Sequence, residues 1–338
     1  MKNKKLLVCL LVMIMMVFAA SAAMAVTVSS EADLREQIAA GATEIVIDTD
    51  LELDGTTEQR IIIDSGKNIT LSSTETVTIT NYIPDLFEVQ AGGTLTLKRN
   101  IIIDSTTSIL WANGGTINVN GAVLQTTGSD NNAVYIASNG TLNMSSGEIN
   151  ATNSKATISV SGATAEITGG RVSSTQTQAI ISKANAVVTI SDRAFVETTA
   201  APSANGVWAA ALAKNGGTIN VTGGTLQSMQ GVAISAFTEK SGGSVNISGG
   251  NLTGGAYSVH QSNGASMEIS GGYFNDDKFQ DYIVDGLQMV TVNGKYTVGT
   301  PNYQYHPKTG DETNLVLLAV LLVASALGMT FMRKKACR

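Results

Sequence analysis

Apolar and polar positions follow one short pattern that returns along most of the chain. A small residue or threonine is followed by an apolar, a polar and an apolar residue, then by Ser or Thr, two small residues, any residue and a last apolar residue. The clearest copies are Thr218–Leu226, Ser244–Leu252 and Ser266–Phe274. Weaker copies begin at Asn68, Thr94, Thr116, Thr141, Thr164 and Val187. Successive copies start 22 to 31 residues apart, which predicts a parallel β-solenoid with one coil per repeat.

The alignment of the copies predicts which side chains stack inside the solenoid. Alternate residues of a strand face opposite sides, so the two apolar residues of each triplet should point inward. Three inward rows are predicted: Leu95, Ile117, Leu142, Ala165, Val188, Ile219, Val245 and Met267; Leu97, Val119, Met144, Ile167, Ile190, Val221, Ile247 and Ile269; Ile102, Leu124, Ile149, Val172, Phe195, Leu226, Leu252 and Phe274. The Gly-Gly pairs should form tight corners, because glycine readily adopts positive φ. The repeats and flanking strands leave room for roughly nine to eleven coils.

The segments on either side of the repeats should cover the exposed strand edges of the terminal coils. Residues 29–38 predict a short amphipathic helix with Ser30 as its N-cap and Asp33 at the third position. Residues 276–298 lose the repeat and predict a short helix followed by a hairpin that turns over Asn293 and Gly294. The predicted organisation is an N-terminal cap with the first strands at 26–67, coils at 68–275 and a C-terminal cap at 276–299.

Taken together, residues 27–298 resemble the right-handed parallel β-helix domains of Gram-positive surface proteins, a pectate-lyase-like architecture. The resemblance rests on the repeat, on the helical segment before it and on the closing module after it. It implies an all-β fold, a single-stranded right-handed parallel β-helix with an N-terminal helical cap. The right hand of the helix is implied by the resemblance alone.

The N-terminus has the three parts of a secretory signal peptide. Basic residues lie within positions 2–5, an apolar run covers 6–20, and the small residues Ala23 and Ala25 flank a methionine. This predicts removal of residues 1–25, with cleavage after Ala23 as the alternative. The body of the chain is therefore expected to be exported.

The C-terminus contains an uncharged apolar run, Leu315–Met332, which reaches the lower length limit for spanning a bilayer. A transmembrane helix is predicted at 313–332. The basic tail at 333–338 should then lie in the cytoplasm by the positive-inside rule.

The segment before this run resembles the L-P-x-T-G sorting signals of Gram-positive wall proteins. Pro307, Thr309 and Gly310 match, Lys308 fills the free position, and His306 stands where the family has leucine. The resemblance implies that a sortase cleaves between Thr309 and Gly310, within the linker 300–312, and joins the protein to peptidoglycan. The leucine-to-histidine departure leaves the sortase class open, and retention in the plasma membrane by the helix is the alternative.

Composition narrows the classes of function. The formal net charge is −6, and the two cysteines, Cys9 and Cys337, lie in the predicted signal peptide and tail, which excludes a disulfide scaffold. Charged residues are sparse in the coils and form no basic stripe, so nucleic acid is not expected as a partner.

Catalytic chemistry is not predicted. Glu166 and Glu268 share a repeat position but lie four coils apart, about 20 Å, which is too far for a glycosidase pair. Asp192 beside Arg193 falls on a corner, and His260 is expected at the surface. No zinc, calcium, phosphate-loop or nucleophile motif is present in the sequence, so we expect no catalytic residue, metal or cofactor.

Two features are candidates for ligand contact. The first is an outward polar row with Asn118, Asn143, Asn220 and Asn246, which also includes Thr96, Glu166, Thr189 and Glu268. Its alternative role is to solvate and stitch the sheet. The second is Trp208, in the extra residues of the longest repeat, where it could stack on a sugar or cover the base of its own loop. The other tryptophan, Trp111, aligns with Ile136 and is expected in the core.

The expected function is that of a non-enzymatic, wall-anchored surface protein that contacts glycans or a host surface. The expected partners are sortase, peptidoglycan, a glycan or host surface, and the membrane before sorting. A structural spacer is the second interpretation, and a polysaccharide lyase or hydrolase is the third.

Overall fold

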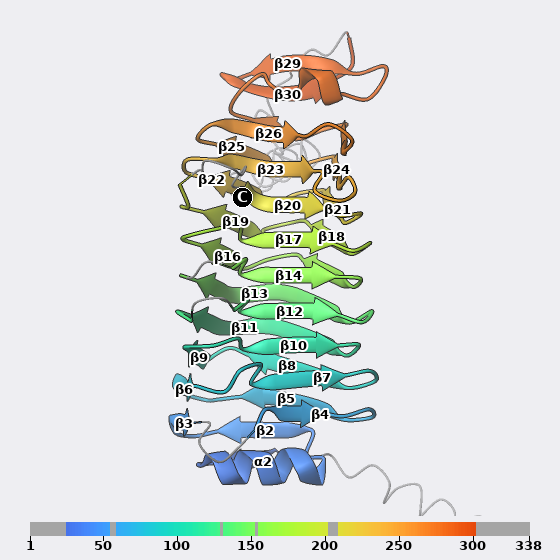
Figure 1. Ribbon diagram of the computed structural model, residues 1–338. Helices are drawn as coiled ribbons and strands as arrows, with labels where there is room; N and C mark the ends of the chain where they lie inside the picture. The colour runs from blue at the N-terminus through green and yellow to red at the C-terminus, as the bar shows by residue number, and fades with distance from the viewer. Residues whose placement is uncertain (1–24, 55–58, 129–130, 153–154, 202–208, 302–338) are drawn as a thin grey trace, which may run out of the picture. The chain divides into compact units, whose positions relative to one another are not determined.

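The computed structural model describes residues 25–54, 59–128, 131–152, 155–201 and 209–301 (Figure 1). These residues form a parallel β-solenoid of about nine turns with little helix. A first compact unit ends at Pro301, and the second unit, residues 302–338, lies outside the described residues. No helix in the described ranges is long and apolar enough to cross a membrane.

Each complete coil contributes one strand to each of three faces, which we call the first, second and third face. The first face consists of β1 (Val26–Val28), β2 (Glu44–Ile47), β5 (Asn68–Ser72), β8 (Thr94–Lys98), the first halves of β11 (Thr116–Thr126) and β13 (Thr141–Ala151), β15 (Thr164–Ile167), β18 (Val187–Ile190), β21 (Thr218–Val221), β24 (Ser244–Ile247) and β27 (Ser266–Ile269). The second consists of β3 (Leu51–Leu53), β6 (Val77–Asn81), β9 (Ile101–Ser105), the second halves of β11 and β13, β16 (Arg171–Ser174), β19 (Phe195–Thr198), β22 (Thr225–Ser228), β25 (Asn251–Gly254) and β28 (Tyr273–Phe274).

The third face is a separate sheet of nine strands, whereas the first and second faces share one sheet because β11 and β13 run through the corner between them. The strands of the third face are β4 (Ile61–Ile63), β7 (Phe87–Gln90), β10 (Leu110–Asn113), β12 (Val134–Ala137), β14 (Ile158–Ser161), β17 (Ile180–Lys183), β20 (Ala209–Lys214), β23 (Val232–Phe237) and β26 (Tyr257–Gln261).

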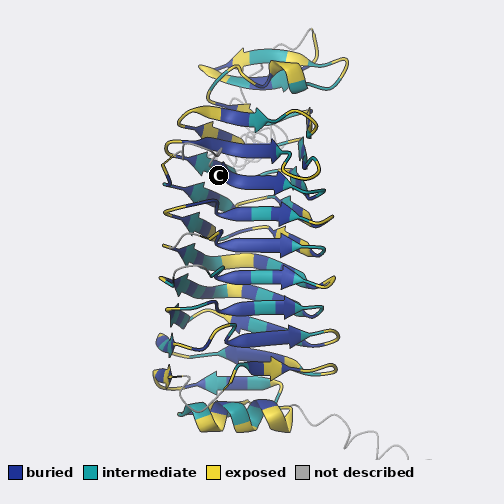
Figure 2. Cartoon of the chain, viewed as in Figure 1, coloured by how far each residue is buried: buried dark blue, intermediate teal, exposed yellow. Residues whose placement is uncertain are grey.

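The stacking of coils confirms the first two predicted inward rows. Each residue of these rows pairs in parallel register with its counterpart on the next coil, as Ile219 does with Val245. All are buried, and they belong to one continuous apolar core that extends from Val28 to Phe279. Figure 2 shows this burial along the strands, with exposed residues mainly at corners and at both ends.

The third predicted row is wrong at two coils. Leu124 pairs with Ile103 rather than Ile102, and Val172 pairs with Val196 rather than Phe195. The corner that precedes Val196 holds one residue more than the corner before Val172. An extra residue exchanges the inward and outward positions of the strand that follows, so Phe195 points outward.

The two glycines of the corner after β24 have different physical roles. In the corner after β24, Gly250 adopts a φ of 91°, a backbone conformation that disfavours residues with a side chain. Gly249 is not in that region, but a Cβ on it would lie 2.3 Å from the Thr222 carbonyl oxygen of the preceding coil. The first glycine therefore permits close stacking, and only the second supplies the positive φ that was expected of the pair.

Both ends of the stack carry non-repeating elements (Figure 1). Helix α2 (Glu31–Ala40) begins at Ser30, whose hydroxyl accepts a hydrogen bond of 3.1 Å from the Asp33 amide. It buries Leu34 and Ile38 in the common core.

At the other end of the stack, β29 (Gln288–Val292) and β30 (Lys295–Gly299) form the expected antiparallel hairpin. Asn293 and Gly294 both have positive φ, as a two-residue turn of this kind requires. The short helix expected before the hairpin is a single 3-10 turn, η1 (Gln280–Tyr282).

Candidate functional site

The outward polar row lies along the middle of the first face, as predicted. Asn118 and Asn143 occupy neighbouring coils, as do Asn220 and Asn246 farther along. Unbroken parallel register joins the two pairs through Glu166 and Thr189. The row ends at Glu268, which pairs with Asn246.

Hydrogen bonds join the asparagines within each pair. The Asn143 side-chain amide donates to the Asn118 carbonyl oxygen at 2.9 Å, and Asn246 donates to Asn220 at 2.9 Å. Asn118 in turn donates to the Thr96 hydroxyl at 3.1 Å. These bonds stitch adjacent coils, which was the alternative role predicted for the row. A side-chain amide has two donor hydrogens and two acceptor lone pairs, so one such bond leaves capacity for a ligand.

The C-terminal half of the row borders a hollow. A surface depression of about 380 Å³ is lined by Thr189, Asn220, Asn246 and Glu268, together with Ser248 and Val284. We call it the first-face hollow. Asn118 and Asn143 do not line it, although their chemistry and their hydrogen bond match those of Asn220 and Asn246.

Val284 reaches this hollow from the segment after the last coil. Its amide donates to the Ile269 carbonyl at 3.1 Å, and the preceding residue, Ile283, forms a parallel bridge with Ile269. The repeat pattern has ended before residue 284, so the pattern does not predict this contact. The hollow presents amides, hydroxyls and one exposed carboxylate, a set that can both donate hydrogen bonds to and accept them from ligand hydroxyls.

An arginine on the second face joins acids of different coils. Arg171 forms an ion pair with Glu197, and its Nε donates to the same carboxylate at 3.1 Å. This hydrogen bond raises the pKa of the Arg171 guanidinium, and Glu148, in register with Arg171 on the preceding coil, acts in the same direction. The sequence reasoning missed this cluster because its members lie more than twenty residues apart.

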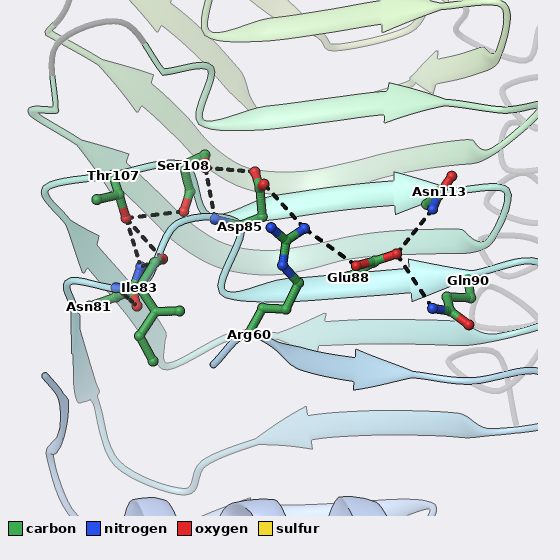
Figure 3. A network of polar contacts seen from close by, with 9 residues as sticks. All are labelled: Arg60, Asn81, Ile83, Asp85, Glu88, Gln90, Thr107, Ser108 and Asn113. Carbon is green, nitrogen blue, oxygen red and sulfur yellow. Dashed lines mark hydrogen bonds and ion pairs between the residues drawn. The ribbon is translucent and has the colours of Figure 1, made fainter. Parts of the chain in front are cut away.

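A second arginine organises a polar network near the N-terminal end of the third face (Figure 3). Arg60 lies 3.3 Å from a carboxylate oxygen of Glu88 and 3.4 Å from one of Asp85. The buried Glu88 also accepts a hydrogen bond of 3.0 Å from Asn113. The network compensates the charge of Glu88, which would otherwise be costly to bury.

The expectation that Trp111 lies in the core is wrong. Trp111 pairs with Tyr135, and it is Ala112 that pairs with Ile136. Leu110 and Ala112 take the inward positions of β10, so the alternation of a strand turns Trp111 outward. The guanidinium of Arg60 lies over its ring, 5.2 Å from the centroid.

The other residues considered for chemistry are placed as follows. His260 is half-buried rather than at the surface, with its Nδ1 3.0 Å from the Ser235 hydroxyl, and burial lowers its pKa. Asp192 lies on a corner as expected, with a φ of 48°. Within the described part of the chain, no group of three or more His, Cys, Asp or Glu side chains is placed to hold a metal ion.

Several predicted functional residues fall outside the described residues. These are Trp208, the cleavage-site residue Ala23 and the whole sorting motif His306, Pro307, Lys308, Thr309 and Gly310. The predicted transmembrane helix at 313–332 also lies there. Ala25 is described, and it is exposed immediately before β1.

No family model, curated protein or solved structure matches this chain. The class of protein therefore rests on the fold itself, which is that of a parallel β-solenoid.

Proposed function

We propose that this β-solenoid is a non-enzymatic surface protein that contacts glycans through the first-face hollow. The observation that carries the proposal is the placement of Thr189, Asn220, Asn246 and Glu268 in consecutive register along one 380 Å³ depression. Neighbouring strands repeat at about 4.8 Å, so the hollow offers similar polar groups at regular steps. A regular array of this kind suits a ligand that also repeats, as a polysaccharide does.

The charge of the hollow agrees with a polyhydroxylated ligand. Its amides and hydroxyls are neutral, and Glu268 is its single carboxylate. A carboxylate accepts hydrogen bonds from sugar hydroxyls without needing a basic partner. The open shape of the first-face hollow favours weak contacts repeated along a polymer over deep enclosure of a small molecule.

The location of the protein is a separate part of the proposal. A signal peptide at 1–25, a transmembrane helix at 313–332 and the motif Pro307-Lys308-Thr309-Gly310 support export followed by sortase cleavage after Thr309. Peptidoglycan then becomes the covalent partner. Membrane retention is the alternative, supported by His306 in place of leucine.

Helix α2 and the hairpin β29–β30 are proposed to act as caps. Each covers strands at one end of the stack, where unpaired backbone groups would otherwise recruit other chains. Such caps keep a solenoid of stacked coils soluble.

A structural spacer is the second candidate. The observation that favours it is the pair of Asn–Asn hydrogen bonds, which serve coil stacking without any ligand. A polysaccharide lyase or hydrolase is a third interpretation, distinguished from the other two by release of oligosaccharides from a polymer.

The test uses the two asparagine pairs as matched variants. Purified full-length protein is applied to an array of host-mucin and bacterial-wall glycans, alongside Asn220→Ala/Asn246→Ala and Asn118→Ala/Asn143→Ala. Each double variant loses one Asn–Asn hydrogen bond of 2.9 Å. Asn118→Ala/Asn143→Ala also loses the 3.1 Å bond to Thr96, so this control should lose at least as much stability as the first variant. We expect saturable binding that only the first variant abolishes. Equal effects of the two variants, or no binding by folded wild-type protein, would favour the spacer.

A further inference from the structure

A second hollow of about 410 Å³ lies at the corner between the first and second faces. We call it the corner hollow. It neighbours the first-face hollow, since Thr222 lines one and Gly223 lines the other. None of the residues predicted to contact a ligand lines it.

Two aromatic side chains mark the ends of the corner hollow. Phe195 and Tyr273 are outward residues of the second face, joined in register through Thr225 and Asn251. Three coil steps separate them, which corresponds to about 14 Å along the stack. That span accommodates a short oligosaccharide rather than a single sugar.

The Phe195 end exists because one corner departs from the repeat. The extra residue between β18 and β19 turns Phe195 outward, and Asp192 and Arg193 occupy the place of the usual glycine pair. Arg171, on the preceding coil, lies 5.9 Å from the Phe195 ring centroid and does not line the hollow. Arg171 therefore packs on the Phe195 ring from the preceding coil, while the hollow extends from the ring over the coils that follow.

The Tyr273 end is held by the closing module. The Tyr273 amide donates to the Gly250 carbonyl at 2.8 Å, and Tyr273 pairs with Thr297 of β30. Its backbone is thus fixed on both sides, yet its side chain remains 42% exposed. An exposed aromatic ring on a fixed backbone offers a flat apolar surface at little entropic cost on binding.

Polar side chains and bare backbone lie between the two rings. Thr225 and Asn251 supply a hydroxyl and an amide, while Gly223 and Gly250 place no side chain in the hollow. A Cβ on Gly223 would lie 2.7 Å from the Asp192 amide nitrogen. The close stacking of the two coils therefore leaves no room for a side chain at this position, and the backbone itself lines the hollow there. Asp192 and Arg193 contribute opposite charges, so the lining has no net charge.

We propose that the corner hollow binds a neutral oligosaccharide along the solenoid axis, with Phe195 and Tyr273 stacking on its two end sugars. Aromatic rings suit the apolar C–H faces of pyranoses, and the Thr225 hydroxyl and Asn251 amide suit their hydroxyls. The balanced lining gives no preference for an anionic sugar. This proposal rests on the glycan-contact function proposed above and adds a second site to it.

The experiment is isothermal titration calorimetry of the full-length protein with neutral tetrasaccharides, namely chitotetraose, cellotetraose and mannotetraose, and with tetragalacturonic acid as the acidic comparator. Tyr273→Ala should weaken binding of the preferred neutral sugar about tenfold, because it removes one stacking surface. Tyr273→Phe should retain most of the affinity. Tyr257→Ala is the matched control, because Tyr257 is 48% exposed on the third face, outside the hollow.

Two further variants separate the sites. Asn251→Ala, at an exposed position of the corner hollow, should also weaken binding, whereas Asn220→Ala/Asn246→Ala reports on the first-face hollow. Loss of binding only in the first-face variant would overturn the corner site and preserve the proposed function. Binding of the acidic comparator alone would overturn the neutral ligand, and the absence of any glycan binding would overturn both proposals. The thermal unfolding midpoint of each variant verifies that the fold is retained.

Discussion

Replacement of Gly249 by alanine tests how closely adjacent coils approach at their corners. The new methyl carbon would lie 2.3 Å from the Thr222 carbonyl oxygen and 2.9 Å from its carbonyl carbon. Real Cβ atoms do not come so close to backbone, and the contacted atoms belong to the preceding coil rather than to a movable side chain. The coils must therefore separate locally or the corner must change conformation.

The expected cost follows from this overlap. Insertion of one methyl group into a close-packed contact typically costs about 1–3 kcal/mol. Gly249 does not have a positive φ, so the loss would be steric rather than conformational. The adjacent Ser248→Ala is the matched control, since it adds no atom to the corner and should stay within about 0.5 kcal/mol of wild type.

Urea unfolding followed by far-ultraviolet circular dichroism measures the difference. With a denaturant slope of about 2–3 kcal/mol/M, the midpoint of Gly249→Ala should fall by roughly 0.3–1.5 M. Gly250→Ala should lose stability as well, through its φ of 91°. A Gly249→Ala midpoint equal to that of Ser248→Ala would refute the close approach of the coils.

Three other predictions concern a buried bond, a titratable group and the sorting motif. Asn81→Leu should cost about 1–3 kcal/mol in the same urea assay, because the buried Asn81 side chain both accepts from the Ile83 amide and donates to the Ile83 carbonyl, each at 2.9 Å. An unchanged midpoint would show that the hydrogen bonds of Asn81, drawn in Figure 3, add no net stability. Burial lowers the pKa of His260 below the ordinary histidine value of 6.5, so folding disfavours the protonated ring. The resulting stability is present above that ordinary value and is lost as pH falls through the folded pKa. Unfolding midpoints between pH 7.5 and pH 5 should decline less in His260→Gln, and equal declines would contradict this. Thr309→Ala should leave the protein extractable by detergent from the cell fraction, and unchanged covalent linkage to the wall would rule out the sortase step.

Much of the solenoid follows from local pattern. The apolar-polar-apolar triplets place Ile219 and Val221 inward and Asn220 outward because strand alternation has a strict period of two. The same logic aligns the asparagine row, since equal triplets on successive coils occupy equal places. The Asn293-Gly294 turn and the Ser30 N-cap are also local, because each depends on backbone preferences of a few residues.

The sites depend on contacts that local pattern does not contain. Val284 reaches the first-face hollow only because the chain returns to Ile269 after the repeat has ended. Arg171 meets Glu197 across neighbouring coils, so their contact depends on the register and on the length of the intervening corner. The same dependence explains why Trp111 points outward although its alignment with Ile136 predicts a core position, since a shift of one residue reverses inward and outward positions.

The sequence by itself determined the repeat, the solenoid class and the polar row, because these arise from alternation within strands and from the recurrence of one short pattern. Only the tertiary structure decided which asparagines border a hollow, where corner insertions turn Phe195 outward, and how the closing hairpin holds Tyr273. The physical reason is that the corners differ in length. The number of residues in a corner determines which residues of the next strand point inward, and the backbone pairing between coils fixes that register.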